Sequence, residues 1–379
     1  MNIKSLLLGS AAALAAVSGA RAADAVVVAE PEPVEYVRVC DVYGAGFYYI
    51  PGTETCLKIG GYVRFDVRAG NAGTGYGGLN DVNDRLENKT NDTYYTRTRA
   101  AVKLDARSET ELGTLRGYMH VDFDWKQVQD EAGDANTATV WGMEHAFIEL
   151  GGFRVGKTDS LFATLTGYAG NVIADDMIPY AAGTYDTQQI VYNYVAGNGF
   201  SASVGVENGS LDNSIDSYVP HVVAGAAYTQ GWGGVSGVVG YDSNFEEWAG
   251  KLRLDVNATE QLSLFVMAGY GSEKNAPVSF YKGWNGKWAA WGGATYKFNE
   301  KLAANLQVSY AQGSDKWVDD KGNTFAQETA VAANVAYTLV PGLTITPEVD
   351  YKRIRFHDVN GDRKHENAWS GMVRFQRSF

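Results

Sequence analysis

Apolar and polar positions alternate along most of the chain. In LKIGGYVRFDVRA (57–69), the odd positions are apolar, whereas even positions carry charged side chains such as Arg64 and Asp66. The segments TRTRAAVKLDA (96–106) and LRGYMHVDFDW (115–125) repeat this pattern. A period of two is typical of a β-strand with two chemically different faces, whereas a helix would need a period near 3.6.

Sixteen segments with this character are expected to be strands. They are 57–69, 94–106, 112–125, 139–150, 152–158, 189–196, 199–207, 220–229, 232–242, 246–257, 260–270, 287–298, 301–311, 326–339, 342–357 and 367–379. Every second connection is short, and these connections read RSETE, GG, GNG, GWG, NATE, FNEK and VPG. The intervening connections are mostly long, namely 70–93, 125–139, 158–188, 208–219, 271–286, 312–325 and 357–367, with DSNFE (242–246) as a brief exception.

This sorting of the connections predicts a membrane barrel. Outer-membrane barrels have an even number of strands, short turns at the periplasmic end and long loops at the extracellular end. Closure also removes the unpaired strand edges that hydrocarbon does not tolerate. If the apolar face contacts lipid, the charged face lines an aqueous channel, because sixteen strands enclose more space than side chains fill. We therefore predict an all-β fold, a transmembrane antiparallel β-barrel of 16 strands.

The N-terminus has the pattern of an export signal. Lys4 precedes the short apolar run LLLGSAAALAAVSGA, and the small-x-small sequence ARA ends at residue 22, so residues 1–22 are expected to be a cleaved signal peptide. We expect residues 23–56 to be an N-terminal periplasmic segment and 57–379 to be the barrel. The mature chain would carry 30 basic and 44 acidic residues, a formal charge of −14, which argues against nucleic acid as a partner.

The chain has two cysteines, Cys40 and Cys56. In an exported protein this even number and modest spacing favour an intrachain disulfide. Such a loop would contribute about 3 kcal/mol in the chain-entropy model. A metal site and a reactive thiol are the alternatives, but there is no CxxC motif, and the nearest histidine is His120.

Several enzyme motifs fail on their context. GTGYGG (73–78) matches GxGxxG but lies in a polar loop before another strand, not in a strand-to-helix turn. DVNGDRKHE (358–366) resembles a calcium loop, but its glycine comes earlier than an EF-hand requires. The five histidines are dispersed, and no GxSxG motif occurs. We therefore expect a protein that is not an enzyme and that uses no cofactor or metal.

The chain is similar to the general porins of Gram-negative outer membranes, and most of all to their alphaproteobacterial branch. The residues that carry the resemblance are VEYVRVCDVYGAGFYYIPGTETCLKIGGYVRFDV (34–67), FIELGGFRVGKTDSLF (147–162) and the terminal VRFQRSF, together with the signal sequence. The match extends over essentially the whole chain.

The resemblance implies roles for particular residues. The third long connection would fold into the barrel and narrow the pore, and its acidic residues are Asp159, Asp175, Asp176 and Asp186. The basic wall facing it would comprise Arg64, Arg97, Arg99, Arg116 and Arg374, and the resulting transverse field would filter solutes by charge as well as size. Pairing of these arginines with neighbouring carboxylates such as Asp66, Asp105 and Glu348 is the alternative. Phe379 would be the signal read by the barrel-assembly machinery.

The predicted function is passive diffusion of small hydrophilic solutes and ions across the outer membrane. The resemblance implies a homotrimer, in contact with outer-membrane lipid and lipopolysaccharide. We expect the small residues Ala330, Ala332, Asn334 and Ala336 to lie on the outer face, where they would permit close contact between barrels. The alternatives are an adhesin or receptor, a substrate-specific channel and an outer-membrane hydrolase.

Overall fold

A computed structural model describes residues 38–72, 76–181, 185–276, 278–314, 318–319 and 321–379. The expected signal peptide, residues 1–22, and residues 23–37 lie outside the described residues. Within the described part of the chain, no helix is long and apolar enough to cross a membrane.

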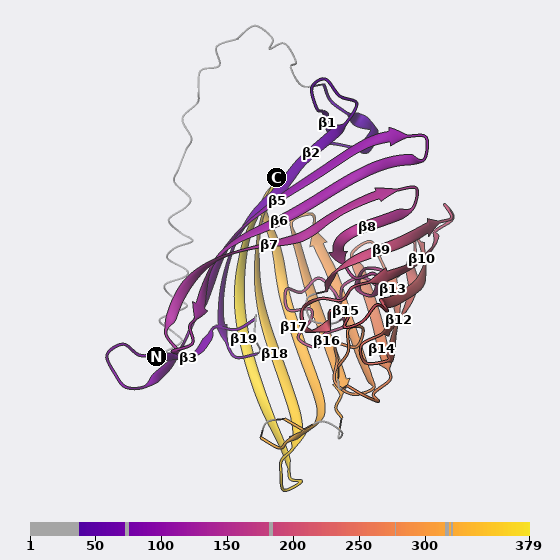
Figure 1. Cartoon of the computed structure of the whole chain (residues 1–379). Coiled ribbons are helices and arrows are strands. Elements are labelled where there is room, and N and C mark those ends of the chain that lie inside the picture. The colour runs from indigo at the N-terminus through magenta and orange to yellow at the C-terminus, as the bar shows by residue number, and fades with distance from the viewer. Residues whose placement is uncertain (1–37, 73–75, 182–184, 277, 315–317, 320) are drawn as a thin grey trace, which may run out of the picture. The chain divides into compact units, whose positions relative to one another are not determined.

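Sixteen strands of the described chain form one closed antiparallel ring (Figure 1). Each strand pairs with its neighbours in sequence, and the last strand pairs with the first. The strands are β2 (Cys56–Gly70), β5 (Tyr95–Thr110), β6 (Gly113–Gln129), β7 (Ala135–Leu150), β8 (Phe153–Asp159), β9 (Asp186–Val195), β10 (Phe200–Glu207), β11 (His221–Gln230), β12 (Gly233–Asp242), β13 (Glu247–Asn257), β14 (Leu262–Gly271), β15 (Trp288–Asn299), β16 (Leu302–Gln312), β17 (Thr324–Val340), β18 (Leu343–His357) and β19 (Arg363–Ser378). All sixteen predicted strands are therefore confirmed.

Alternation along the strands sorts side chains between the two faces of the ring. On β2, Val63 and Phe65 are 49% and 41% exposed, whereas the neighbouring Asp66 points to the opposite face and is fully buried. Trp125, Trp141 and Trp369 are exposed as well. The apolar face is thus the outer face, as a barrel in lipid requires.

The connections follow the predicted sorting with two differences. β6 and β7 continue beyond their expected ends, and only residues 130–134 separate them. β18 and β19 likewise leave only 358–362, because these hairpins extend past the length that crosses a bilayer. The short GG turn has positive φ at both Gly151 and Gly152, the conformation that a two-residue hairpin turn favours.

Two short pairings lie outside the ring. β3 (Leu79–Asn83) and β4 (Thr90–Thr93) form a separate hairpin in the connection after β2, which the strand pattern did not predict. β1 (Tyr48–Tyr49) pairs with the beginning of β2.

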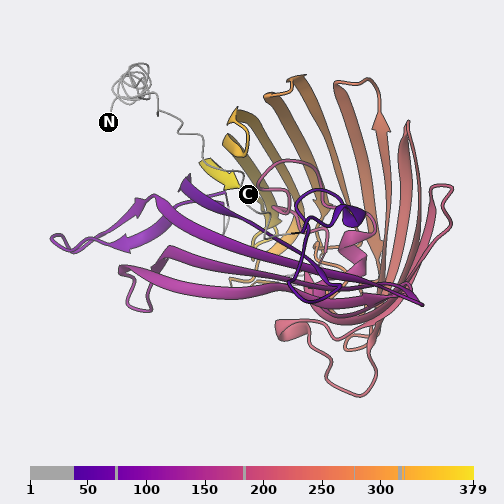
Figure 2. The same ribbon diagram turned by 90° about the horizontal axis from the view of Figure 1, so that it is seen from above.

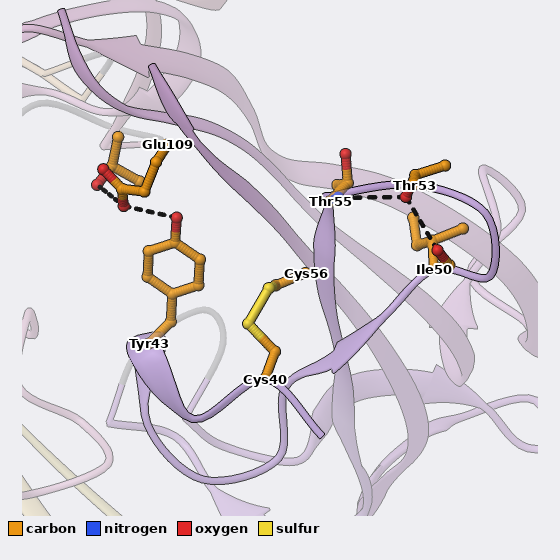
Figure 3. The surroundings of a disulfide bond; sticks show 8 residues. Cys40, Tyr43, Ile50, Thr53, Thr55, Cys56 and Glu109 are labelled. Carbon is orange, nitrogen blue, oxygen red and sulfur yellow. Dashed lines mark hydrogen bonds between the residues drawn. A yellow bond between two sulfur atoms is a disulfide. The ribbon is translucent and has the colours of Figure 1, made fainter. Parts of the chain in front are cut away.

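The predicted disulfide joins Cys40 to Cys56 and is confirmed (Figure 3). Both cysteines are buried and pack with Phe47 in a small cluster. Tyr43, in the 3₁₀ turn η1 (Asp41–Tyr43), donates a hydrogen bond to Glu109 at 2.6 Å. The disulfide loop is therefore fixed to β2 covalently and to the end of β5 by a hydrogen bond.

Candidate pore constriction

The connection between β8 and β9, residues 160–185, is called the inserted loop here. It begins with the short helix α2 (Leu161–Thr164), whose N-cap Ser160 accepts a hydrogen bond from the Phe162 N–H at 3.1 Å. Glu207, at the end of β10, accepts hydrogen bonds from the Ser160 hydroxyl and the Leu161 N–H at 2.7 and 2.8 Å. Figure 2 shows the barrel from above, with this part of the chain inside the ring of strands.

Side chains of the inner wall hold the backbone of the inserted loop. Glu348 on β18 accepts hydrogen bonds from the N–H groups of Ile173 and Ala174 at 2.5 and 2.7 Å. The Trp291 indole on β15 donates to the Ile178 carbonyl at 2.9 Å. Further hydrogen bonds join Arg253 to Tyr168, Asn334 to Asn171, Gln307 to Asp175 and Lys352 to Met177. The loop therefore crosses the interior as far as β18, and its predicted inward position is confirmed.

A second connection also folds inward. Residues 272–287, between β14 and β15, contribute Tyr281 and Trp284, each 1% exposed. Tyr281 packs on Phe162 of the inserted loop at 5.1 Å between ring centroids, and Trp284 packs edge-on against Trp291 at 5.6 Å. Neither aromatic contact was predicted, because alternation along strands carries no information about how loops pack inside the barrel. One side of the barrel is thus filled by an apolar core.

The prediction for the small residues of β17 was wrong. Asn334 lies on the inner face, where it donates to the Asn171 carbonyl at 3.1 Å and to Glu348 at 2.8 Å. Ala330 and Ala332 have the same parity and are at most 1% exposed. The wall needs small side chains here because the inserted loop packs directly against it. Both faces of AVAANVAYTL are nearly uncharged, so the pattern did not distinguish inside from outside.

Four of the five predicted arginines meet on neighbouring strands. Arg97 on β5 donates to Asp66 at 2.7 Å, and Arg374 on β19 donates to the same carboxylate at 2.8 Å. Arg64 donates to the Gln376 side chain at 2.8 Å. Arg64 also lies opposite Arg99 in the β2–β5 register.

Carboxylates are interleaved with these arginines. Arg99 binds Asp124 through two hydrogen bonds of 2.7 and 2.8 Å and forms an ion pair with Asp122. Arg116 belongs to a separate group. It pairs with Asp105 at 3.0 Å and with Glu149 at 2.8 Å. It precedes Asp124 by eight residues on β6, about 26 Å along an extended strand.

The central acids of the inserted loop are turned into its packed side. Asp175 accepts a hydrogen bond from the Tyr180 hydroxyl at 2.7 Å. Burial is the main cause that raises the pKa of Asp175 to about 6, and it also raises the pKa of Asp176. These acids have lost most of their contact with water and hold protons more tightly than exposed carboxylates do.

The two acids at the ends of the loop have their own partners. Asp186 forms an ion pair with Lys157, and Asp159 accepts a hydrogen bond from the Tyr168 hydroxyl. Among the described residues, no ion pair joins Asp159, Asp175, Asp176 or Asp186 to any of the five predicted arginines. The carboxylates beside the arginines are instead wall residues, above all Asp66, Asp122 and Asp124. Glu348, which was considered as a partner of the arginines, instead accepts hydrogen bonds from the inserted loop.

The geometry thus divides the interior into two sides. The inserted loop and its apolar contacts occupy the side formed by β9 to β18, and the charged wall lies on β19, β2, β5 and β6. This wall has more arginines than carboxylates near Asp66. The arginines are Arg64, Arg68, Arg97, Arg99 and Arg374, and the carboxylates are Asp66, Asp122 and Asp124. A solute passing between the two sides would meet a surface with more guanidinium groups than carboxylates.

Comparisons with known proteins agree with this architecture. A model of a porin subfamily matches residues 24–372. Porin Omp2a of Brucella melitensis is 47% identical over 401 residues, and Porin Omp2b of Brucella canis is 48% identical over 397 residues; both alignments cover 100% of each chain.

Solved structures share the fold at low sequence identity. The outer membrane channel DcaP of Acinetobacter baumannii matches with a TM-score of 0.63 at 19% identity, covering 87% of this chain and 99% of that one. OmpT of Vibrio cholerae, solved in its trimer form, matches with a TM-score of 0.51 at 12% identity, covering 86% and 100%.

Proposed function

The chain belongs to the porin subfamily, and on this premise we propose that it is a general diffusion porin of the outer membrane. It forms a water-filled channel through which small hydrophilic solutes and ions pass down their gradients. The observation that carries this proposal is the inserted loop, which is hydrogen-bonded across the interior and leaves the charged wall on the other side of the channel. The arrangement supplies a constriction.

We propose that Arg64, Arg97, Arg99 and Arg374 form the basic side of the constriction. Their support is their shared position around Asp66 and the excess of guanidinium groups there. Arg116 would act nearer the periplasmic mouth. Because burial or pairing weakens the field of the predicted loop acids, we propose a weak preference for small anions. Charged groups lining a pore select ions in this way.

Partners and processing complete the proposal. The mature protein would begin at residue 23, and Phe379 would be recognised by the barrel-assembly machinery. A homotrimer is supported by the trimer form in which the similar OmpT was solved. Lipid and lipopolysaccharide would surround the exposed apolar face.

The test is single-channel conductance of the purified protein in a planar bilayer, with the reversal potential measured in a salt gradient. We expect stable steps in groups of three and a potential whose sign shows anion preference. A folded, heat-modifiable barrel without conductance would refute diffusion, and a potential of the opposite sign would refute the dominance of the arginine wall.

A further inference from the structure

Five basic side chains gather on the outer face of the last hairpin. They are Arg353, Arg355 and His357 on β18 and Arg363 and His365 on β19. In the β18–β19 register, Arg355 lies opposite His365 and His357 lies opposite Arg363. We call this set the outer basic cluster.

The cluster faces away from the channel. Arg353 and Arg355 have the same parity on β18 as Val349, which is 55% exposed, and opposite parity to Asp350, which is fully buried. Side chains two residues apart share a face of a strand. The cluster therefore continues the lipid-facing surface, not the pore wall.

An aromatic pair next to the cluster indicates where the cluster lies relative to the membrane. The rings of Tyr351 and Trp369 are 4.6 Å apart, and Trp369 is 60% exposed, as expected for an interfacial aromatic girdle. β18 and β19 have 15 and 16 residues, whereas about 9 to 11 residues cross the hydrocarbon. The pairing of β19 with β2 ends at Ser370, so β19 continues past the end of β2, and Figure 1 shows the yellow hairpin projecting at this end. The cluster thus lies where lipid headgroups are.

The cluster has no acidic partner within the described chain. No hydrogen bond or ion pair to a carboxylate involves any of its five members, and the buried Nε of Arg353 has no hydrogen-bond partner. The nearby Asp358 and Asp362 pair with Lys364, and Glu328 pairs with Lys352 on the inner face. The side chains line a depression of about 440 Å³ that also includes Gln327 and Phe356.

We propose that the outer basic cluster binds the phosphate groups of an anionic glycolipid of the outer leaflet. Guanidinium groups bind phosphate oxygens through paired charge-assisted hydrogen bonds, and the exposed apolar surface below the cluster would accept the acyl chains of the same molecule. This inference deepens the proposed lipid contact by naming its surface, and it is independent of ion conduction.

The test measures how much lipid A the purified protein and its variants retain after incubation with this lipid. The measurement is native mass spectrometry. Arg353→Gln together with Arg355→Gln should weaken lipid binding roughly 25-fold, because each basic residue near an anionic membrane surface contributes a factor of about five. Arg377→Gln is the matched control, since it changes an arginine of the same outer face of β19 at the opposite end of the barrel. Conductance of the double variant should stay unchanged.

Four outcomes would overturn the proposal. Equal lipid retention by the double variant and the Arg377→Gln control would show that the cluster does not bind the lipid. Equal binding of dephosphorylated lipid A would exclude phosphate recognition, and displacement by millimolar inorganic phosphate would assign the site to the free ion. Dissociation of oligomers with unchanged lipid retention would make the cluster an interface between copies instead. Loss of conductance alone would concern the proposed channel and not the cluster.

Discussion

Asp66 on the first strand of the barrel and Arg374 on the last are joined by an ion pair with a distance of 2.8 Å from Oδ1 to Nε. The two residues are 308 positions apart, and their contact closes the ring on its inner face. Asp66 also binds Arg97 on the next strand, and its side chain is fully buried. One carboxylate therefore joins three neighbouring strands and partly neutralises the basic wall.

The first prediction concerns this carboxylate. Asp66→Asn removes a negative charge among several arginines, so the wall should become more positive and the permeability of chloride relative to potassium should rise roughly twofold. The measurement is the reversal potential in a salt gradient. Asp105→Asn is the control, because it also faces two arginines but lies near Arg116, away from the proposed constriction. An equal shift in both variants would contradict the assigned position of the constriction.

The positions of Asp66 and Arg374 show what the pattern of the chain could predict. Where one face is charged and the other apolar, the period of two fixed both the strand and its inner face, as for Arg64, Arg97 and Arg99. Where both faces are small and neutral, as around Ala332, the inner face was assigned wrongly. Strand alternation depends on chemical contrast, and contrast is lost wherever a packed loop replaces water inside the barrel.

The pattern of the sequence did not predict the contacts of the inserted loop. The length of the connection after β8 indicated an inward fold only through the family resemblance, and nothing indicated the partners of its backbone. Glu348 and Trp291 hold the loop from strands more than 100 residues away. Such contacts depend on how far the loop crosses the interior, which no local period encodes. The burial of Asp175 and Asp176 follows from the same crossing.

The second prediction tests the anchor of the inserted loop. Glu348→Ala leaves the N–H groups of Ile173 and Ala174 without their acceptor, and each unsatisfied buried donor costs about 1–3 kcal/mol. The loop should loosen, and single-channel recordings should show greater open-channel noise and frequent substates. Asp105→Ala removes a wall carboxylate that pairs with Arg107 and Arg116 and serves as the control. Recordings of Glu348→Ala as quiet as those of the unmodified protein would refute the anchoring role.

The third prediction is a pH dependence of stability that arises from Asp175. Its pKa is about 6 in the folded protein, against 3.8 for an aspartate exposed to water, so the folded protein binds the proton more tightly than the unfolded chain. The contribution of protonated Asp175 to the stability of the folded protein is complete below pH 3.8 and is lost as the pH rises through about 6. Asp175→Asn, which stays neutral, should therefore match the unmodified protein near pH 4 and exceed it near pH 7 by up to about 3 kcal/mol.

The measurement for Asp175 is the temperature at which the barrel loses its heat-modifiable mobility, taken for both proteins from pH 4 to 7. The difference between the two curves isolates Asp175 from the other titrating groups. Asp212→Asn, in the exposed turn η2 (Leu211–Asn213), is the control for the loss of one carboxylate. A difference for Asp175→Asn that is constant with pH would contradict the raised pKa of Asp175.

The fourth prediction concerns Phe379. Its N–H and carbonyl both hydrogen-bond to Gly61 at 3.1 Å, and its side chain is 65% exposed on the outside. Deletion of Phe379 removes one pair of hydrogen bonds at a strand end but no buried side chain, so the assembled barrel should lose little stability. Incorporation into the outer membrane should nevertheless fall strongly if the residue is read during assembly. Phe375→Leu, which changes an exposed aromatic residue of the same strand, is the control. Normal incorporation of the truncated chain would reduce Phe379 to an interfacial anchor, whereas poor incorporation of a chain that refolds normally in detergent would separate recognition from stability.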